Sequence, residues 1–252
     1  MQADHAAAKG SVERVLHVLA TLARLGRGAT IAELMELTGL AQSTLYRQLS
    51  LLRRWGFVIG RDNEFSPGPM CVPLAWGFDQ SSFLTHESHD KMEALSSLSG
   101  ESVGLLVAVR HQIVCLDMVE SRHPLRCSFV KGRMLPLNKG ASAKALLAFM
   151  HVEQRRTVLD QLLRDQWLDE AARADLELQL ERIRTQGYAV SNGEVDVGIW
   201  GASAPLFQHT GHPAVAVITM MAPALRAQGQ EDHFIEMTVR GAAHISSQLQ
   251  DL

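Results

Sequence analysis

The chain contains few of the residues that mark a secreted, membrane-spanning or metal-binding protein. Only three of its 252 residues are cysteine, and their spacing fits neither a disulfide framework nor a zinc module. No run approaches the ~18 continuous apolar residues that suggest a membrane helix, and the first residues lack the pattern of a signal peptide. We therefore expect a cytoplasmic protein without a membrane partner, a metal or a cofactor.

Recognisable catalytic motifs are also missing, as are a phosphate-binding loop and a dinucleotide fingerprint. Gly201-Ala202-Ser203-Ala204-Pro205 has proline where a nucleophile elbow has its second glycine. Ser142-Ala143-Lys144 is one residue short of the Ser-x-x-Lys spacing. His86-Glu87-Ser88-His89 is likewise one residue short of the zinc-protease motif. We expect no catalytic residues, which makes an enzyme the weaker alternative.

Acidic residues are absent from one stretch of the N-terminal third. Residues 1–67 carry eight Lys or Arg and six Asp or Glu, whereas the whole chain has a net charge of -3. Between Leu37 and Arg61 there is no acid, although four arginines fall there. A cation cluster without acids is what a phosphate backbone requires. A chance gap on a solvated face would also explain the pattern.

Residues 1–67 also contain the helix-start, helix-end and turn signals of a small helical domain. Apolar periodicity and turn signals predict helices over 11–25, 31–38 and 42–55, followed by a hairpin over 57–66. Thr30 and Glu33 form a predicted capping box, and Gly39 suits a tight turn between helices. We interpret residues 11–68 as a winged helix-turn-helix domain, preceded by a disordered Ala-rich leader over 1–10.

The third predicted helix has two contrasting faces. Leu45, Leu49 and Leu52 recur at helical spacing and form its inward face. Polar side chains suited to base edges and phosphates occupy the rest of the helix, and its N-terminal residues are those that reach bases in such domains. The predicted DNA-binding residues are Gln42, Ser43, Thr44, Tyr46, Arg47, Ser50 and Arg53. The alternative is a polar helix that simply faces solvent.

The remainder of the chain alternates between helical and strand patterns. We expect a linker helix over 69–84 and an α+β domain over 85–252. Its first helix, 85–99, should turn Met92, Leu95 and Leu98 inward. The other predicted helices cover 142–150, 153–164, 170–186 and 231–249, and the predicted strands cover 102–109, 113–120, 125–130, 202–207 and 214–221.

Landmarks in both parts resemble those of the IclR-type (isocitrate-lyase-regulator) family of bacterial transcription regulators. They run in order along nearly the whole chain, as Ser11–Leu16, Ile31–Leu34, Thr38–Arg47, Leu137–Phe149, Gln186–Val190, Gly193-Glu194, Gly198 and Ala202–Leu206. The resemblance implies a two-domain α+β fold, with a winged helix-turn-helix, a connecting helix and a GAF-like effector-binding domain built on a curved antiparallel sheet.

The resemblance also implies partners and a mode of action. They are a double-stranded DNA operator, a small organic-acid effector, further copies of the chain in a homodimer or dimer of dimers, and RNA polymerase.

Two residues depart from the family pattern: Gln42 replaces a usual basic residue, and Ala143 replaces a usual glycine. The first bears on base preference or DNA affinity, and the second on the turn at the pocket rim.

An effector pocket is implied at family positions in the second domain. They fall on Leu137, Ala141, Ser142, Thr219 and Met221, with Trp200 and Ser203 nearby along the chain. We expect Ser142 and Thr219 to hold the polar end of an aromatic or short aliphatic acid, with Leu137, Met221 and Trp200 around its apolar body. For Leu137 and Met221 taken alone, core packing is the stronger explanation, and for Ser142 a helix cap explains the residue as well as a ligand contact does. The competing function is a small-molecule enzyme or sensor whose N-terminal domain mediates protein contacts.

Overall fold

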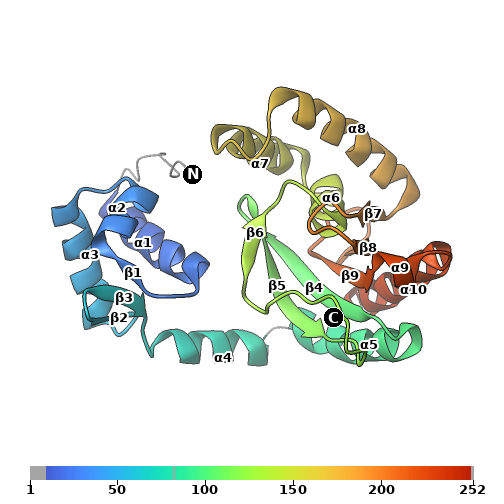
Figure 1. The fold of residues 1–252 in the computed structure, drawn as a ribbon, viewed down its shortest axis with the longest axis horizontal. Coiled ribbons are helices and arrows are strands. Elements are labelled where there is room, and N and C mark those ends of the chain that lie inside the picture. The colour runs from blue at the N-terminus through green and yellow to red at the C-terminus, as the bar shows by residue number, and fades with distance from the viewer. Residues whose placement is uncertain (1–9, 82, 251–252) are drawn as a thin grey trace. The chain divides into compact units, whose positions relative to one another are not determined.

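The computed structural model describes residues 10–81 and 83–250, and the chain divides into two compact units, Met1–Ser82 and Phe83–Leu252 (Figure 1). The predicted disordered leader lies outside the described residues, apart from Gly10. None of the helices in the described ranges is long and apolar enough to span a bilayer.

The first unit is a helix-turn-helix with a small sheet. Its elements are α1 (Ser11–Leu25), β1 (Ala29–Thr30), α2 (Ile31–Thr38), α3 (Gln42–Arg54), β2 (Val58–Arg61), β3 (Glu64–Pro67) and α4 (Cys71–Ser81). The predicted helices and hairpin are confirmed, and the structure adds β1, which pairs with β3 so that the sheet order is β1-β3-β2. A strand of two residues is too short to produce a recognisable alternation of apolar and polar residues in the sequence.

Local chemistry sets the boundaries of these elements. The Thr30 hydroxyl accepts from the Glu33 amide at 3.3 Å, and the Thr30 amide donates to Glu33 Oε2 at 3.0 Å, so the capping box is confirmed. Gly39 ends α2 with φ 67°, a conformation that a Cβ would penalise. Asp62 and Asn63 both have positive φ, as a two-residue hairpin turn requires.

The core of the first unit fixes how α3 is oriented. Leu45, Leu49 and Leu52 are buried together with Val18 and Leu22 of α1. Each fully buried leucine contributes about 1.5–3 kcal/mol relative to an exposed one. The three leucines therefore hold one face of α3 inward and leave the opposite face open to solvent.

The second unit is built on a six-stranded antiparallel sheet with the order β6-β5-β4-β9-β8-β7. Its strands are β4 (Ser102–Val109), β5 (Gln112–Val119), β6 (Met134–Pro136), β7 (Ala189–Asn192), β8 (Ile199–Leu206) and β9 (Ala216–Pro223). Its helices are α5 (Phe83–Ser99), α6 (Ala141–Phe149), α7 (Val152–Arg164), α8 (Glu170–Gln186), α9 (Ala224–Ala227) and α10 (Glu231–Gln250).

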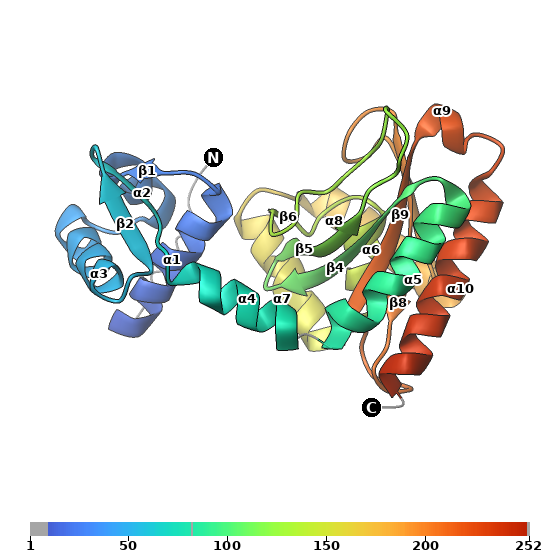
Figure 2. The same ribbon diagram turned by 90° about the horizontal axis from the view of Figure 1, so that it is seen from below.

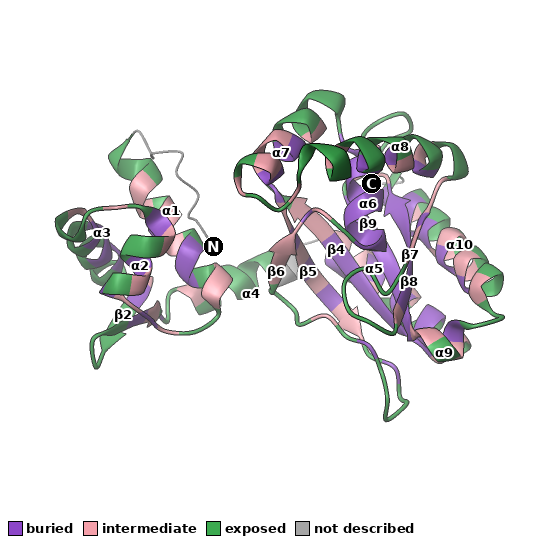
Figure 3. Cartoon of the chain, turned by 45° about the horizontal axis from the view of Figure 1, so that its top comes forward, coloured by how far each residue is buried: buried purple, intermediate pink, exposed green. Residues whose placement is uncertain are grey.

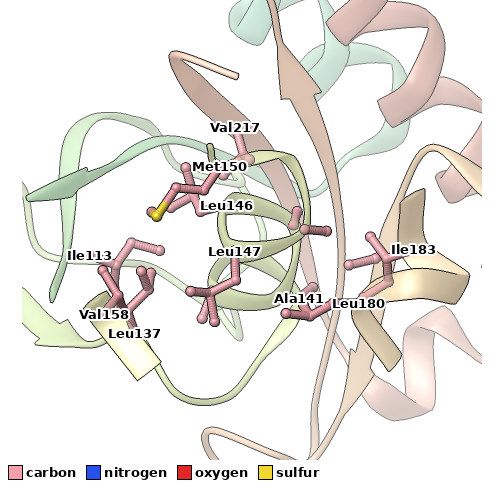
Figure 4. Close-up of a cluster of buried hydrophobic side chains, with 14 of the residues drawn as sticks. Ile113, Leu137, Ala141, Leu146, Leu147, Met150, Val158, Leu180, Ile183 and Val217 are labelled. Atoms are coloured by element: carbon pink, nitrogen blue, oxygen red, sulfur yellow. The ribbon is translucent and has the colours of Figure 1, made fainter. Parts of the chain in front are cut away.

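Helices cover both faces of this sheet. The neighbours α5 and α10 lie along one face, and α6 lies on the other, with α8 against it (Figure 2). The middle strands are consequently buried on both sides, as the colouring in Figure 3 shows. One hydrophobic core lies on each face, and Figure 4 shows the core around α6.

Two predictions about this unit are wrong. Residues 125–130 form no strand: the Leu125 carbonyl accepts from the Arg226 side chain instead of from a neighbouring strand, and the Ser128 hydroxyl donates to the Glu120 carboxylate. The edge next to β5 is instead taken by β6. Leu98 of α5 is 78% exposed, whereas Met92 and Leu95 face inward as predicted.

Candidate functional site

The outward side of α3 carries nearly all of the predicted DNA-binding side chains. Gln42, Ser43, Arg47, Ser50 and Arg53 are exposed. Tyr46 is also exposed and Thr44 is half-buried. The described structure therefore brings the seven residues onto one helix and keeps most of them accessible. Hydrogen-bonding groups on an exposed helix in this position can enter a major groove.

The start of α3 is also suited to an anion. Ala41 occupies the N-cap and has no side chain that can accept a hydrogen bond from the first amides. Those amides lack partners within the helix, and together they favour a phosphate oxygen. The Glu33 carboxylate at the start of α2 is engaged by the Arg27 guanidinium at 2.8 Å, which lowers the pKa of that carboxyl.

The second unit holds a cavity of about 320 Å³ on the side of the sheet that carries α6. Its wall combines sheet residues, the segment 127–136, the N-terminal turn of α6 and the loop before β8. The apolar part of the wall includes Leu106, Ile113, Cys115, Cys127, Phe129, Val130, Leu135, Pro136, Val195, Ile199 and Met221. The polar part includes Ser128, Arg133, Asn138, Lys139, Ser142, Ser191, Asp196 and Thr219.

Three hydroxyl groups meet where α6 reaches the sheet. Ser142 Oγ lies 2.9 Å from Thr219 Oγ1, which lies 2.6 Å from Ser203 Oγ. Ser203 and Thr219 are direct cross-strand partners in β8 and β9, and all three residues are buried. Each hydroxyl can donate one proton and accept others, so the cluster can reorient to meet a polar ligand group.

The first turn of α6 presents backbone amides to the same cavity. Ala141, Ser142 and Ala143 line it, and the first intrahelical bond is made only by the amide of Lys144. The amides of a first helical turn have no partner within the helix and carry the positive end of its dipole. This turn and the hydroxyl cluster together form a polar end that favours a carboxylate.

The loop 193–198 is anchored beside this polar end. Glu194 accepts from the Gly140 amide at 3.0 Å and from the Lys144 ammonium at 2.5 Å. The Lys144 side chain is buried, so its charge requires this partner. Val195 and Asp196 of the loop line the cavity, and the Glu194 contacts therefore hold part of the cavity wall in place.

The predicted effector residues are not all brought together. Ala141, Ser142, Thr219 and Met221 line the cavity, and Ser203 lies behind Thr219. Leu137 is fully buried in the core around α6 and does not line it. Trp200 faces the opposite side of the sheet, where its ring lies 5.9 Å from that of Phe234.

Several residues that line the cavity were not predicted from the sequence. Ile113 and Cys115 alternate along β5, and that alternation places both on the face of α6 once the sheet is known. Cys127 and Phe129 come from the segment that was predicted as a strand. Their contribution depends on a loop path that no local sequence pattern specifies.

The Cys115 thiol in the cavity and the histidine motif over 86–89 are the groups to consider for catalysis or metal binding. Burial raises the pKa of the Cys115 thiol to about 11, which keeps it protonated and poorly nucleophilic near neutral pH. Within residues 10–81 and 83–250, no three His, Cys, Asp or Glu side chains are grouped to hold a metal ion. His89, from the motif that is one residue short of a zinc site, instead contacts Asp117.

A helix-turn-helix unit with an exposed polar helix and a second unit with a polar-ended cavity match the two parts of a DNA-binding transcription regulator with an effector domain. A family model described as the IclR helix-turn-helix domain matches residues 11–59, and one described as the bacterial transcriptional regulator IclR C-terminal domain matches residues 80–247. The chain belongs to the IclR family, whose members are transcription regulators and not enzymes.

Similar proteins extend over nearly the whole chain. The HTH-type transcriptional regulator KdgR of Dickeya chrysanthemi is 28% identical over 246 residues, which cover 95% of this chain and 80% of the relative. The transcriptional repressor IclR of Escherichia coli K12 is 27% identical over 94% of this chain and 88% of its own length. The crystal structure of an IclR family transcriptional regulator from Brucella abortus matches with a TM-score of 0.81 at 21% identity, covering 94% of this chain and 92% of that one.

Proposed function

We propose that this IclR-family regulator senses a small organic acid in the cavity beside α6 and alters its hold on a DNA operator in response. The observation that carries the proposal is the convergence of the free α6 amides with the hydroxyls of Ser142 and Thr219 at one end of the cavity. In this position they would receive the carboxylate, with Ala141 and Ala143 allowing its close approach.

The rest of the wall suits the body of such an acid. Ile113, Leu135, Phe129 and Met221 provide apolar surface, and the volume of about 320 Å³ is at the small end of ligand cavities. An aromatic acid or a short aliphatic acid would fit. Ser203 would support the orientation of Thr219 without touching the ligand, whereas Leu137 and Trp200 would stabilise the fold.

The residues of α3 would make two kinds of contact with the operator, some with base edges and the others with phosphates. Gln42 can both donate and accept, as a bidentate contact with an adenine edge requires, and Arg47 has the two donors for a bidentate contact with a guanine edge. The hydroxyls and the second arginine would hold phosphates and set the register of the helix, through Ser43, Thr44, Tyr46, Ser50 and Arg53. A bacterial transcription regulator acts on the chromosome, and we therefore propose that this protein is located in the cytoplasm.

A second copy of the chain would complete the DNA-binding unit. One helix-turn-helix covers a half-site, and operators mirror the symmetry of the protein. The helix α4 exposes apolar side chains that a monomer would leave in water, namely Val72, Leu74, Trp76 and Phe78. Val12 and Leu16 of α1 are exposed as well. We propose a homodimer, or a dimer of dimers, in which these side chains are covered.

Trp76→Glu is expected to weaken this dimer, because it places a charge among apolar side chains that would be buried on association. Sedimentation velocity should show a larger monomer fraction than for the wild type at the same concentration. Trp167→Glu, at an exposed tryptophan of the second unit, is the matched control and should leave the distribution unchanged. Equal dimer fractions for the wild type and Trp76→Glu would exclude α4 from the interface.

The effector assignment is tested with a panel of acetate, pyruvate, benzoate and 4-hydroxybenzoate in thermal-shift assays, followed by calorimetry. Ser142→Ala should weaken binding of the acid that stabilises the wild type by about 10-fold or more, since a hydrogen bond to a charged group contributes about 1.5–3 kcal/mol. Thr157→Val, at an exposed helix threonine, is the control. An unchanged affinity in Ser142→Ala would remove Ser142 from the site.

A further inference from the structure

A β-bulge interrupts the pairing of β5 with β4. Asp117 lies opposite Leu105, whereas Cys115 lies opposite the next residue, Leu106, so Leu116 is the extra residue in β5. In a regular strand, residues two apart share a face. The bulge breaks that rule here: Cys115 lines the cavity, whereas Asp117 contacts α5 on the other face. Without the bulge, a carboxylate would point into the apolar part of the cavity.

The Asp117 carboxylate contacts two different segments. Its Oδ2 lies 2.6 Å from His89 Nδ1 on α5, and its Oδ1 lies 3.5 Å from Lys131 Nζ. The Asp117 side chain is only 10% exposed, and a carboxylate so far from water requires charged or donating partners. Both oxygens are therefore engaged, one by each segment.

Lys131 belongs to the segment that forms the cavity wall. Its neighbours Val130 and Arg133 line the cavity, and the Gly132 amide donates to the Cys115 carbonyl at 2.8 Å. A displacement of the segment 127–136 would therefore change the distance from Lys131 to Asp117. The same carboxylate would transmit the change to His89, which lies on the helix that begins the second unit and follows α4 along the chain.

We infer that Asp117 is a positioning residue that couples the cavity wall over 127–136 to helix α5 through its contacts with Lys131 and His89. The inference rests on the proposed function, because such a link regulates DNA binding only if the cavity receives an effector. One carboxylate with two partners would form this link, and a ligand could bias it only by favouring one position of the segment 127–136 over another.

The His89–Asp117 contact gives this link a pH dependence. The hydrogen bond that the protonated His89 ring donates to Asp117 is the main cause that raises the pKa of His89 above its ordinary 6.5, and the charges of Glu93 and Asp90 of α5 add to it. A raised pKa in the folded state stabilises the fold fully below about pH 6.5, and the stabilisation is lost as pH rises through the raised pKa. Urea unfolding across this window should show the loss for the wild type and not for His89→Gln. Parallel profiles for the two proteins would contradict it.

Hydrogen exchange of the full chain, followed by mass spectrometry, tests the coupling directly. Lys131→Met should accelerate exchange severalfold in peptides that cover α5, although the substitution lies in the segment 127–136 and not on that helix. In an Asp117→Asn background, the same substitution should have no further effect on α5, because the link is already broken. Arg156→Met, which removes a charge from an exposed position of α7 outside the cavity wall, should leave exchange in α5 unchanged.

Either of two results would overturn the inference. The first is that Lys131→Met has no effect on exchange in α5. The second is that Lys131→Met accelerates exchange in α5 equally in the wild-type and Asp117→Asn backgrounds. The experiment contains neither acid nor DNA, so its failure is distinct from failure of the proposed function, which the acid panel and operator binding test.

Discussion

Arg47→Ala is expected to lower the affinity of the protein for its operator by about 10- to 100-fold, the range expected for losing one good bidentate base contact. Arg47 is exposed on α3, one turn after the helix start, and buried leucines fix the helix face on which it stands. The loss should fall on specific binding, because the proposed base contact would distinguish the operator from other duplexes. Fluorescence anisotropy with operator and scrambled duplexes measures both affinities.

Two controls make this result interpretable. The melting temperature of Arg47→Ala should match the wild type, since the side chain is exposed to solvent. Arg182→Ala, at an exposed arginine of α8, removes the same charge from the other unit and should leave operator affinity unchanged. Wild-type footprinting by Arg47→Ala would contradict the assignment of α3 as the helix that reads the operator.

Arg226→Ala is expected to destabilise the second unit by about 3–5 kcal/mol, the usual cost of removing one partner from a buried ion pair. Glu101 is 2% exposed at its side chain, and both of its carboxylate oxygens accept from the Arg226 guanidinium. Arg226 also donates to the Leu125 carbonyl at 3.1 Å, so its loss should free the loop that leads to the cavity wall. Urea unfolding gives the change in the free energy of unfolding.

A nearby pair provides the matched control. Arg126 contacts Glu120 at 2.7 Å, but both side chains are more than two-fifths exposed and water screens the pair, so Arg126→Ala should change the free energy of unfolding far less than Arg226→Ala does. In a Glu101→Gln background, Arg226→Ala should cost less than in the wild type, because no buried charge is stranded. Equal, small effects of Arg226→Ala and Arg126→Ala would show that the buried carboxylate does not depend on Arg226.

The first unit could be predicted almost entirely from its sequence, because its boundaries are set by neighbours in the chain. The Thr30–Glu33 capping box, the turn at Gly39 and the Asp62-Asn63 hairpin each depend on residues within a few positions. The exposed face of α3 followed from the spacing of three leucines. Only the two-residue strand β1 was missed, since it forms by pairing with a distant strand.

The second unit could be predicted less completely, because distant contacts decide its details. The loop over 125–130 has a strand-like composition, but Arg226, about a hundred positions away, fixes its path. Strands buried on both faces show little alternation, which hid the fact that Trp200 and Gly201 face opposite sides of the sheet. Ser142 and Thr219 were placed by resemblance alone, and their meeting depends on how α6 docks on β9.

The most direct test of the account is a footprint of the wild-type protein on the DNA upstream of its own gene, with and without the acid that stabilises it. We expect a protected segment of two related half-sites, an affinity that falls steeply as salt is added, and a shift in affinity when the acid is present. Binding that does not depend on DNA sequence or on salt concentration, or protection that the acid leaves unchanged, would contradict this expectation.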